Sequence, residues 1–294
     1  MDSFRSAPKV SIALPVYNGE KTLIRTIDAI LGQSYKDFEL VISDNASTDK
    51  TSEICQKYAK LDKRIRYIRQ KTNIGIYPNF RFVLDKARAE YFMWWAADDF
   101  KSNDFLKLNL AFLEKNSNYV ACTSPNKMEA IDDKASLLST FALNGNLEQR
   151  FFCFFNNCWH SHGIFYSLIR KSALNDCKFI GEHFFAADWA IILHLASKGK
   201  IKRLDEGEMI SGLSGISSGS EAWNAFHKRF YHWFMPLYEF TFYTLVLSQK
   251  YSINLRLKIF ARLLFLNLYC TFQKYFSISH KIYSDYIKKK LLKR

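Results

Sequence analysis

The first hundred residues alternate between continuously apolar runs and segments in which apolar residues recur at helical spacing. Strands are expected at residues 10–17, 38–43, 64–69 and 91–97. Helices are expected around residues 23–31, 54–61 and 79–88, and from Phe105 onward. Continuous apolar runs predict strands that are buried on both faces, and the spacing between them predicts amphipathic helices. Strands alternating with helices predict βαβ units and an α/β fold with a mostly parallel sheet.

Polar residues follow three of the expected strands. The first strand ends at residues 15–18 and runs into the loop 18–20, the second is followed by Asp44, and the last by Asp98 and Asp99. In open α/β sheets, ligands bind at the carboxyl ends of the strands. We therefore expect these polar residues to gather at one edge of the sheet.

The Asp98–Asp99 pair predicts a cation site. Mg²⁺ and Mn²⁺ prefer carboxylate oxygens and usually also hold a substrate phosphate. The structural alternative is that the two residues cap the following helix, since Asp is favoured at a helix N-terminus. The cation reading predicts metal-assisted chemistry on a phosphate-bearing substrate.

Five short motifs occur in one order along the chain. They are Ala-Leu-Pro-Val-Tyr-Asn at 13–18, Gln-Ser-Tyr at 33–35 before the strand 38–42, Asp-Asn-Ala-Ser-Thr-Asp at 44–49, Asn-Ile-Gly at 73–75 and Ala-Ala-Asp-Asp at 96–99. Their order and spacing resemble the family 2 glycosyltransferases of the GT-A fold. The resemblance implies a Rossmann-like central sheet flanked by helices, and an inverting sugar transfer from a nucleoside diphosphate sugar.

The same resemblance assigns roles to individual residues. The residues implied to bind the nucleotide sugar are Pro15, Tyr17, Asn18, Glu20, Asp44, Asn73, Asp98 and His162. Tyr17 would lie near the base, although packing in the core is an equal alternative for this ring. Asp44 would accept a hydrogen bond from the N–H of a uracil or thymine, which favours a UDP- or dTDP-linked donor. Asp99 would coordinate the Mn²⁺ or Mg²⁺ ion that bridges the diphosphate.

Other nucleotide-binding signatures are missing, and one family feature is altered. No Gly-x-Gly-x-x-Gly follows the first strand, and the chain contains no Walker loop, which disfavours a dinucleotide-dependent dehydrogenase and a P-loop enzyme. The family often carries another acidic residue just before the acidic pair, where this chain has Ala96 and Ala97.

Residues 185–195 resemble the family helix that carries the catalytic base, and Asp188 stands at the base position. Ala187 replaces the usual Glu. Asp188 is thereby expected to accept the proton of an acceptor hydroxyl that attacks the anomeric carbon, giving inversion. The structural alternative is a helix cap stabilised by the helix dipole.

Two further segments of the second half have open interpretations. Residues 162–174 resemble the family's strand and short helix, and His160 and His162 either approach the sugar or diphosphate or are ordinary loop histidines. The Gly/Ser-rich segment 207–220 is either a lid over the donor or a plain linker.

The cysteines and the N-terminus predict a cytoplasmic protein. None of the six cysteines forms a Cys-x-x-Cys motif, which disfavours a zinc site or a disulfide framework. The first nine residues contain no apolar signal-peptide core.

Most of the net charge of +14 lies near the C-terminus, where residues 250–294 contain eleven basic residues and one acidic residue. We expect a catalytic domain at residues 1–220, with a nucleotide-binding half at 1–100 and an acceptor half at 101–220. A helical, basic extension is expected at 221–294. Aromatic and apolar residues at 230–247 and 259–272 predict two amphipathic helices, both too short or too interrupted to span a bilayer.

The basic, apolar composition of the extension favours peripheral binding to the anionic cytoplasmic face of the inner membrane over nucleic acid. A dimer contact or a core helix is the structural alternative, and a homo-oligomer is compatible with the sequence. The leading functional hypothesis is a transferase acting on a glycan or lipid-linked acceptor in cell-surface polysaccharide or lipooligosaccharide synthesis. The alternative is a non-catalytic GT-A-like scaffold attached to membrane or nucleic acid through its basic tail.

Overall fold

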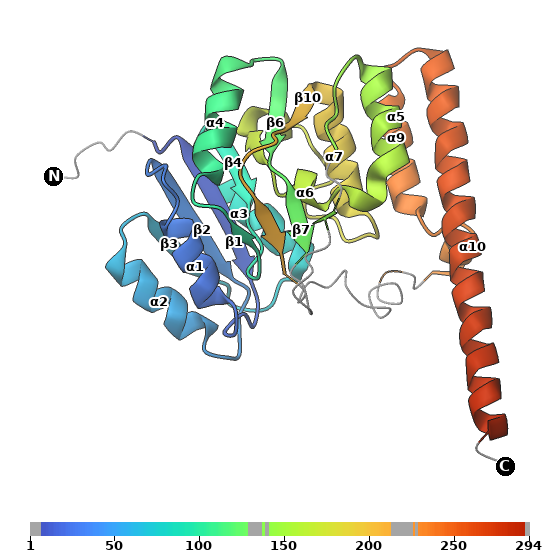
Figure 1. Ribbon diagram of the computed structural model, residues 1–294, viewed down its shortest axis with the longest axis horizontal. Helices are drawn as coiled ribbons and strands as arrows, with labels where there is room; N and C mark the ends of the chain where they lie inside the picture. The colour runs from blue at the N-terminus through green and yellow to red at the C-terminus, as the bar shows by residue number, and fades with distance from the viewer. Residues whose placement is uncertain (1–6, 129–136, 139–140, 213–225, 227–228, 292–294) are drawn as a thin grey trace. The chain divides into compact units, whose positions relative to one another are not determined.

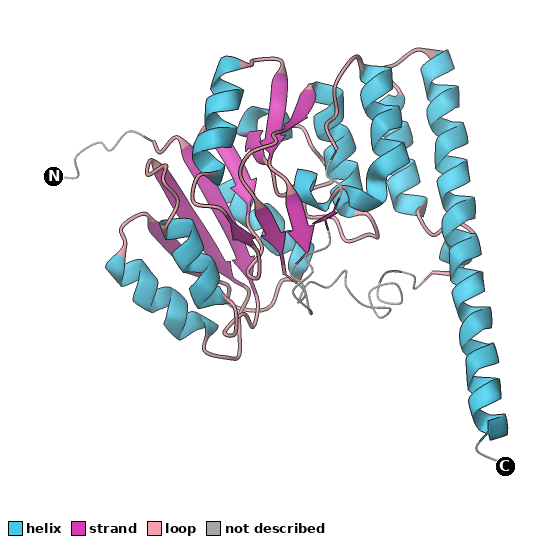
Figure 2. Cartoon of the chain, in the orientation of Figure 1, coloured by secondary structure: helices cyan, strands magenta, loops and turns pink. Residues whose placement is uncertain are grey.

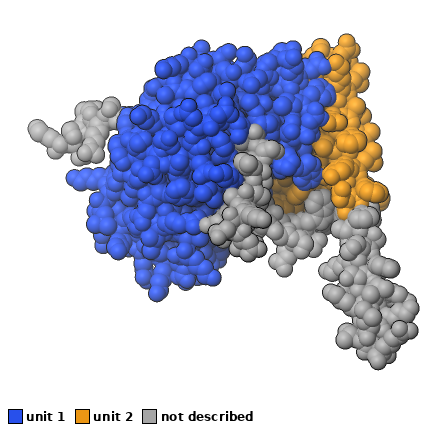
Figure 3. Space-filling view, in the orientation of Figure 1, with its two compact units in different colours: residues 1–183, 187–218 blue, residues 184–186, 219–294 orange. Residues whose placement is uncertain are grey.

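The computed structural model describes residues 7–128, 137–138, 141–212, 226 and 229–291 of the chain. Its contacts separate two compact units, coloured in Figure 3. Unit 1 comprises Met1–His183 and Ala187–Ser218, and unit 2 comprises Phe184–Ala186 and Gly219–Arg294.

Unit 1 is built on a seven-stranded sheet in the order β10-β6-β9-β4-β1-β2-β3 (Figure 1). Its strands are β1 Val10–Val16, β2 Phe38–Asp44, β3 Ile65–Arg69, β4 Tyr91–Trp94, β6 Tyr119–Thr123, β9 Leu168–Arg170 and β10 Lys200–Arg203. All neighbouring pairs are parallel except those of β9, which runs antiparallel to β4 and β6. The expected mostly parallel α/β sheet is confirmed.

Helices flank the sheet on both faces (Figure 2). The helices of unit 1 are α1 Leu23–Leu31, α2 Thr51–Leu61, α3 Ile76–Lys86, α4 Phe105–Lys115, α5 Leu147–Asn157, α6 His162–Phe165 and α7 Ala187–Lys198. The crossovers from β1 to β2 and from β2 to β3 move in one direction along the sheet, whereas the crossover from β3 to β4 moves back past β1. Because such crossovers are right-handed, α1 and α2 share one face and α3 covers the other.

This reversal makes the gap between β1 and β4 the switch point of the sheet. Ligands of open α/β sheets bind at this point, outside the carboxyl ends of the strands. Residues 17–18 leave β1 there, and residues 95–99 leave β4 beside them, with the Trp95 N–H donating to the Ala13 carbonyl at 2.9 Å. Two of the expected polar strand ends therefore flank the predicted crevice, and Asp44 is paired in register with Val16 on the adjoining strand.

A second sheet of four short strands holds the chain just after the acidic pair. It consists of β5 Phe100–Lys101, β7 Asn126–Met128, β8 Leu137–Leu138 and β11 Met209–Ser211, in the order β5-β11-β7-β8. Strand β11 is antiparallel to β5 and parallel to β7. Part of the segment 207–220, which was expected to be a lid or a linker, is therefore a paired strand at 209–211, and residues 213–220 lie outside the described residues.

Residues 162–174 contain the expected strand followed by a short helix, and a further short helix precedes them. The short helix α6 comes first, β9 follows it, and the 3-10 turn Lys171–Leu174 comes last. The ring of Phe165 at the end of α6 stacks on Trp94 of β4, with centroids 4.9 Å apart and planes inclined by 2°. This aromatic contact fixes α6 against the strand that leads into the acidic pair.

Unit 2 contains the 3-10 turn Phe230–Trp233 and the helices α9 Tyr238–Ser248 and α10 Ile253–Leu291. The helix expected over 230–247 is therefore broken before Pro236, whose ring removes a backbone donor. The second expected helix, at 259–272, is the middle of the much longer α10. Among the described helices, none combines the length and hydrophobicity that a transmembrane segment requires.

Candidate active site

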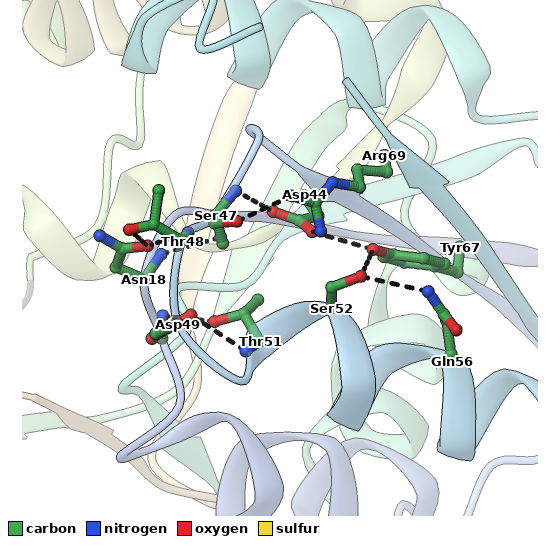
Figure 4. A network of polar contacts seen from close by, with 11 residues as sticks. Asn18, Asp44, Ser47, Thr48, Asp49, Thr51, Ser52, Gln56, Tyr67 and Arg69 are labelled. Atoms are coloured by element: carbon green, nitrogen blue, oxygen red, sulfur yellow. Dashed lines mark hydrogen bonds and ion pairs between the residues drawn. The ribbon is translucent and has the colours of Figure 1, made fainter. Parts of the chain in front are cut away.

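Asn18 joins the loop after β1 to the loop after β2 (Figure 4). Its side-chain oxygen accepts hydrogen bonds from the Thr48 backbone N–H at 2.9 Å and from the Thr48 hydroxyl at 3.3 Å. Its own backbone N–H donates to the Ser47 hydroxyl at 3.0 Å. Asn18 has φ of +51° and Ala46 has φ of +61°, so both loops turn sharply through the left-handed region.

Asp44 is completely buried at the end of β2 and organises the loop that follows. One carboxylate oxygen accepts the Ser47 N–H at 2.8 Å, and the other accepts the Tyr67 hydroxyl at 2.8 Å. The Arg69 guanidinium lies 3.6 Å from that second oxygen (Figure 4). A carboxylate offers about four acceptor positions, so Asp44 retains capacity for one more donor.

The other expected nucleotide-binding residues of this half fall into two groups. Glu20 and Asn73 hold loops: the Glu20 carboxylate accepts the Lys50 N–H at 3.1 Å, and the Asn73 side-chain oxygen accepts the Gly75 N–H at 2.9 Å. Pro15 is buried within β1, whereas the Tyr17 ring just beyond it is 48% exposed. Of these four residues, Tyr17 offers an exposed aromatic face at the switch point.

Gly212 lies directly against the acidic pair. Its N–H donates to Oδ1 of Asp99 at 3.1 Å. A Cβ atom at position 212 would lie 2.4 Å from Oδ2 of Asp98 and 2.6 Å from its backbone oxygen, so only glycine fits this close approach. The end of β11 therefore fixes the geometry of both carboxyl groups.

Lys101 is a buried cation beside Asp99. Its side chain is fully buried, and its ammonium nitrogen lies 3.8 Å from Oδ2 of Asp99. The same nitrogen faces the rings of Trp95, Phe105 and Tyr166, with centroids at 4.6, 5.4 and 5.6 Å. Burial lowers the pKa of Lys101 to about 8, against the opposing charge of Asp99. Burial likewise raises the pKa of Asp99, while Lys101 and the Gly212 N–H lower it.

His162 lies close to this ion pair. Its Nε2 atom is shielded from solvent and has no hydrogen-bond partner in the described part of the chain. Burial and the charge of Lys101 lower the pKa of His162 to about 4, and the charge of Asp98 acts in the opposite direction. The imidazole is therefore neutral at physiological pH, and Nε2 is a buried, uncharged polar atom.

Asp188 opens helix α7 and converges on the same region. Burial raises its pKa to about 6, although the backbone N–H groups of Trp189 and of Asp188 itself lower it. Burial, followed by the charges of Asp99, Asp98 and Asp188, holds the pKa of Tyr166 well above its ordinary value. Tyr166 is thus a buried tyrosine within electrostatic range of all three carboxyl groups.

Among the residues expected from the sequence, the structure brings together Asp98, Asp99, His162 and Asp188. Asp44 belongs to a separate network at the end of β2. Lys101 and Gly212 were not expected. A lysine two residues after an acidic pair is the one signal that the sequence offered for the buried ion pair.

The acidic pair fits a divalent cation that also binds phosphate. Oδ2 of Asp99 is a buried acceptor without a hydrogen-bond partner among the described residues, and a hard cation prefers such an oxygen. Those residues contain no cluster of three or more His, Cys, Asp or Glu side chains that could hold a metal. Substrate phosphates and water would have to supply most of the ligands, as is usual for Mg²⁺ at nucleotide sites.

A Rossmann-like sheet commonly binds nucleotides at its switch point, and this chain has carboxylates beside that point. The chain matches the family model "Glycosyl transferase family 2" over residues 11–193, and it belongs to this family.

Curated relatives align over part of the chain. The putative glycosyltransferase EpsE of Bacillus subtilis is 40% identical over 115 residues, which are 39% of this chain and 41% of EpsE. The putative teichuronic acid biosynthesis glycosyltransferase TuaG of Bacillus subtilis is 33% identical over 110 residues, 37% of this chain and 44% of TuaG. The alignments thus span less than half the length of these relatives.

Solved structures share the fold over most of the chain. TarS 1–349 of S. aureus in complex with UDP-GlcNAc superposes with a TM-score of 0.64 at 19% identity, over 87% of this chain and 71% of that one. The mannosyltransferase PcManGT of Pyrobaculum calidifontis, in complex with GDP-Man and Mn²⁺, gives a TM-score of 0.57 at 14% identity, over 89% and 70%. These similarities establish a common fold and confirm the expected GT-A architecture.

Proposed function

We propose that this chain is an inverting glycosyltransferase that moves a sugar from a nucleoside diphosphate sugar to a hydroxyl group of a glycan or lipid-linked acceptor. The observation that carries the proposal is the buried acidic site in which the Gly212 N–H donates to Asp99, while the charges of Asp98, Asp99 and Asp188 all act on the buried Tyr166. These carboxyl groups come from the end of β4 and from the start of α7, and they provide both a phosphate-facing side and a base.

A UDP- or dTDP-linked donor is supported by the site and by the fold neighbours. Asp44 has acceptor capacity for the N–H of a pyrimidine ring, and Tyr17 exposes an aromatic face on the adjoining strand. TarS was solved with UDP and with UDP-GlcNAc, whereas PcManGT was solved with GDP-Man. The name of TuaG places that relative in teichuronic acid synthesis, which supports a role for this chain in cell-surface polysaccharide or lipooligosaccharide assembly.

Asp188 is the proposed general base. With a pKa of about 6 it is mostly ionised at pH 7, yet it remains a stronger base than an exposed aspartate. Its carboxylate accepts the proton of the acceptor hydroxyl as the oxygen attacks the anomeric carbon from the face opposite the diphosphate. The carbon–oxygen bond to the diphosphate breaks as the new glycosidic bond forms, and the configuration inverts.

Asp98 and Asp99 act on the leaving-group side. Asp99 would hold Mn²⁺ or Mg²⁺, and Asp98 would hold the ribose or the same ion. The ion, when bound, neutralises charge on the departing diphosphate. Gly212 keeps both carboxyl groups in place through its N–H and its lack of a side chain. Much of the rate enhancement then comes from positioning and electrostatics, because the donor is already activated.

The test is a screen of UDP-, dTDP- and GDP-sugars with Mn²⁺ or Mg²⁺, read as release of the nucleoside diphosphate and as thermal stabilisation. We expect stabilisation by a pyrimidine nucleotide with metal, release of the diphosphate, and loss of release in Asp188→Asn with binding retained. If nucleotide sugars bind but no nucleoside diphosphate is released from any of them, even with lipid-linked acceptors present, the result would favour the non-catalytic scaffold. Preference for the guanine nucleotide would contradict the role proposed for Asp44.

A further inference from the structure

Helix α10 presents a continuous apolar stripe to solvent. The stripe consists of Ile253, Leu257, Phe260, Leu264, Leu268 and Phe272, each between 48% and 67% exposed. Successive members are separated by three or four residues, so they lie along one face of the helix. Exposed apolar residues gathered in this way are characteristic of interaction surfaces, whereas scattered ones are not.

In the described part of unit 2, helix α10 packs through a different side. The buried side of α10 carries Leu255, Ile259, Leu263, Leu266 and Cys270. The Asn267 side chain, also on that side, accepts the Leu237 N–H at 3.0 Å and donates to the Thr241 hydroxyl at 2.8 Å. Since α10 turns by about 100° per residue, the stripe and the buried side point in nearly opposite directions. Helix α10 therefore has a second apolar face that the contacts with α9 leave exposed.

Basic residues border the stripe on both sides. On a helical projection Arg256 lies about 100° from the centre of the stripe in one direction, and Lys258 lies about 100° in the other. Arg262 follows Lys258 on the same border, and Arg256 and Lys258 are exposed. The sequence contains no Asp or Glu between Lys250 and Ser284. The face is thus apolar along its middle, with Arg256 on one edge and Lys258 on the other, where the exposed rings of Phe265 and Tyr269 also lie.

We propose that this face of α10 binds an anionic lipid bilayer, with the helix lying parallel to the surface and the stripe inserted among the acyl chains near the headgroups. Helices with this distribution of apolar and basic residues lie in the membrane interface. The long side chains of Arg256 and Lys258 reach the lipid phosphates while their aliphatic stems cover apolar surface. The proposal depends only on unit 2 and stands apart from the transfer chemistry.

Charge distinguishes the bilayer from other occupants. In a two-fold dimer the same patch faces itself, so the basic borders of two copies would repel each other. Nucleic acid would bind the basic residues through its phosphates, but it offers no partner for six large apolar side chains. An anionic bilayer satisfies both features, because it has a negative surface and an apolar interior.

The experiment is sedimentation of the full chain with phosphatidylcholine vesicles that contain or lack phosphatidylglycerol. The stripe variant Leu257→Gln/Leu264→Gln is compared with the control Ile24→Gln/Leu61→Gln, which replaces two apolar residues of unit 1 that are, as a pair, at least as exposed. We expect binding to phosphatidylglycerol vesicles to fall at least about tenfold in the stripe variant and to change less than about twofold in the control. Arg256→Gln/Lys258→Gln should remove the preference for phosphatidylglycerol.

Three results would overturn the proposal. They are equal binding to neutral and anionic vesicles, full retention of binding in the stripe variant, and absence of binding by the unaltered chain. Analytical ultracentrifugation of the same proteins shows whether they form dimers. A dimer that dissociates when the stripe is substituted would mean that the face binds a second copy of the chain, and not a bilayer. Unchanged thermal midpoints and nucleotide binding show that the variants are folded.

Discussion

The ammonium group of Lys101 lies 3.8 Å from Oδ2 of Asp99, and both atoms are shielded from solvent. Neither atom has a hydrogen-bond partner in the part of the chain that the structure describes. Their charges therefore depend on each other, because an isolated charge in an apolar surrounding is strongly unfavourable. Lys101 lowers the pKa of Asp99 against the effect of burial, and so favours the charged carboxylate where a cation-bound diphosphate is expected.

Replacing Lys101 by methionine should destabilise the protein by about 3 kcal/mol, because the buried Asp99 carboxylate loses its counter-charge. Urea unfolding measures the loss. The double variant Lys101→Met/Asp99→Asn should recover most of it, since neither charge then remains buried alone. Strict additivity of the two single substitutions would show that the two groups do not interact.

Replacing Asp188 by asparagine should reduce sugar transfer by at least about a hundredfold, because the acceptor hydroxyl loses its base. The same change should stabilise the fold. A pKa raised from 3.8 to about 6 corresponds to at most about 3 kcal/mol of unfavourable charge burial. Initial rates and thermal unfolding together test both effects. Asp205→Asn, at an exposed aspartate, is the control and should change neither quantity.

The pH dependence of transfer should report the ionisation of Asp188. Its carboxylate must be charged to accept a proton, so the rate should fall about tenfold per pH unit below pH 6. Stability should change in the opposite sense. Because the folded-state pKa lies above the unfolded value, the contribution of Asp188 to stability rises as the pH falls from about 6 toward 3.8. A rate profile that is flat between pH 5 and 7 would contradict this assignment.

Replacing Gly212 by alanine should displace the acidic pair. The new Cβ would lie 2.6 Å from the Asp98 backbone oxygen, a contact that side-chain rotation cannot relieve. We expect the Kd of a pyrimidine nucleoside diphosphate in the presence of Mn²⁺ to rise at least about tenfold, consistent with the sensitivity of metal sites to displacement of their supporting groups. Calorimetric titration measures this Kd. The neighbouring variant Ile210→Ala serves as the control, and equal losses in both would indicate general damage to β11.

The strands and helices of the first hundred residues could be predicted from the sequence because each depends on local periodicity. The convergence of Asp98, Asp99 and Asp188 could be expected only from the family resemblance, since it requires two distant segments to meet. Lys101 was missed because a lysine is ordinarily exposed, and its burial depends on the pairing of β5 with β11. Gly212 was missed because its position beside the acidic pair also depends on the pairing of β5 with β11, which local sequence does not reveal.

The pairing of β5 with β11 also constrains the order of events during synthesis. Phe100 and Lys101 leave the ribosome long before Met209 and Ile210, their partners in this pairing. The strands β1 to β4 have all their parallel neighbours within the first hundred residues, so they can associate early, whereas the acidic corner must wait for a loop of more than a hundred residues to close. A nascent chain would therefore assemble its Rossmann-like half first and complete the diphosphate-facing corner last.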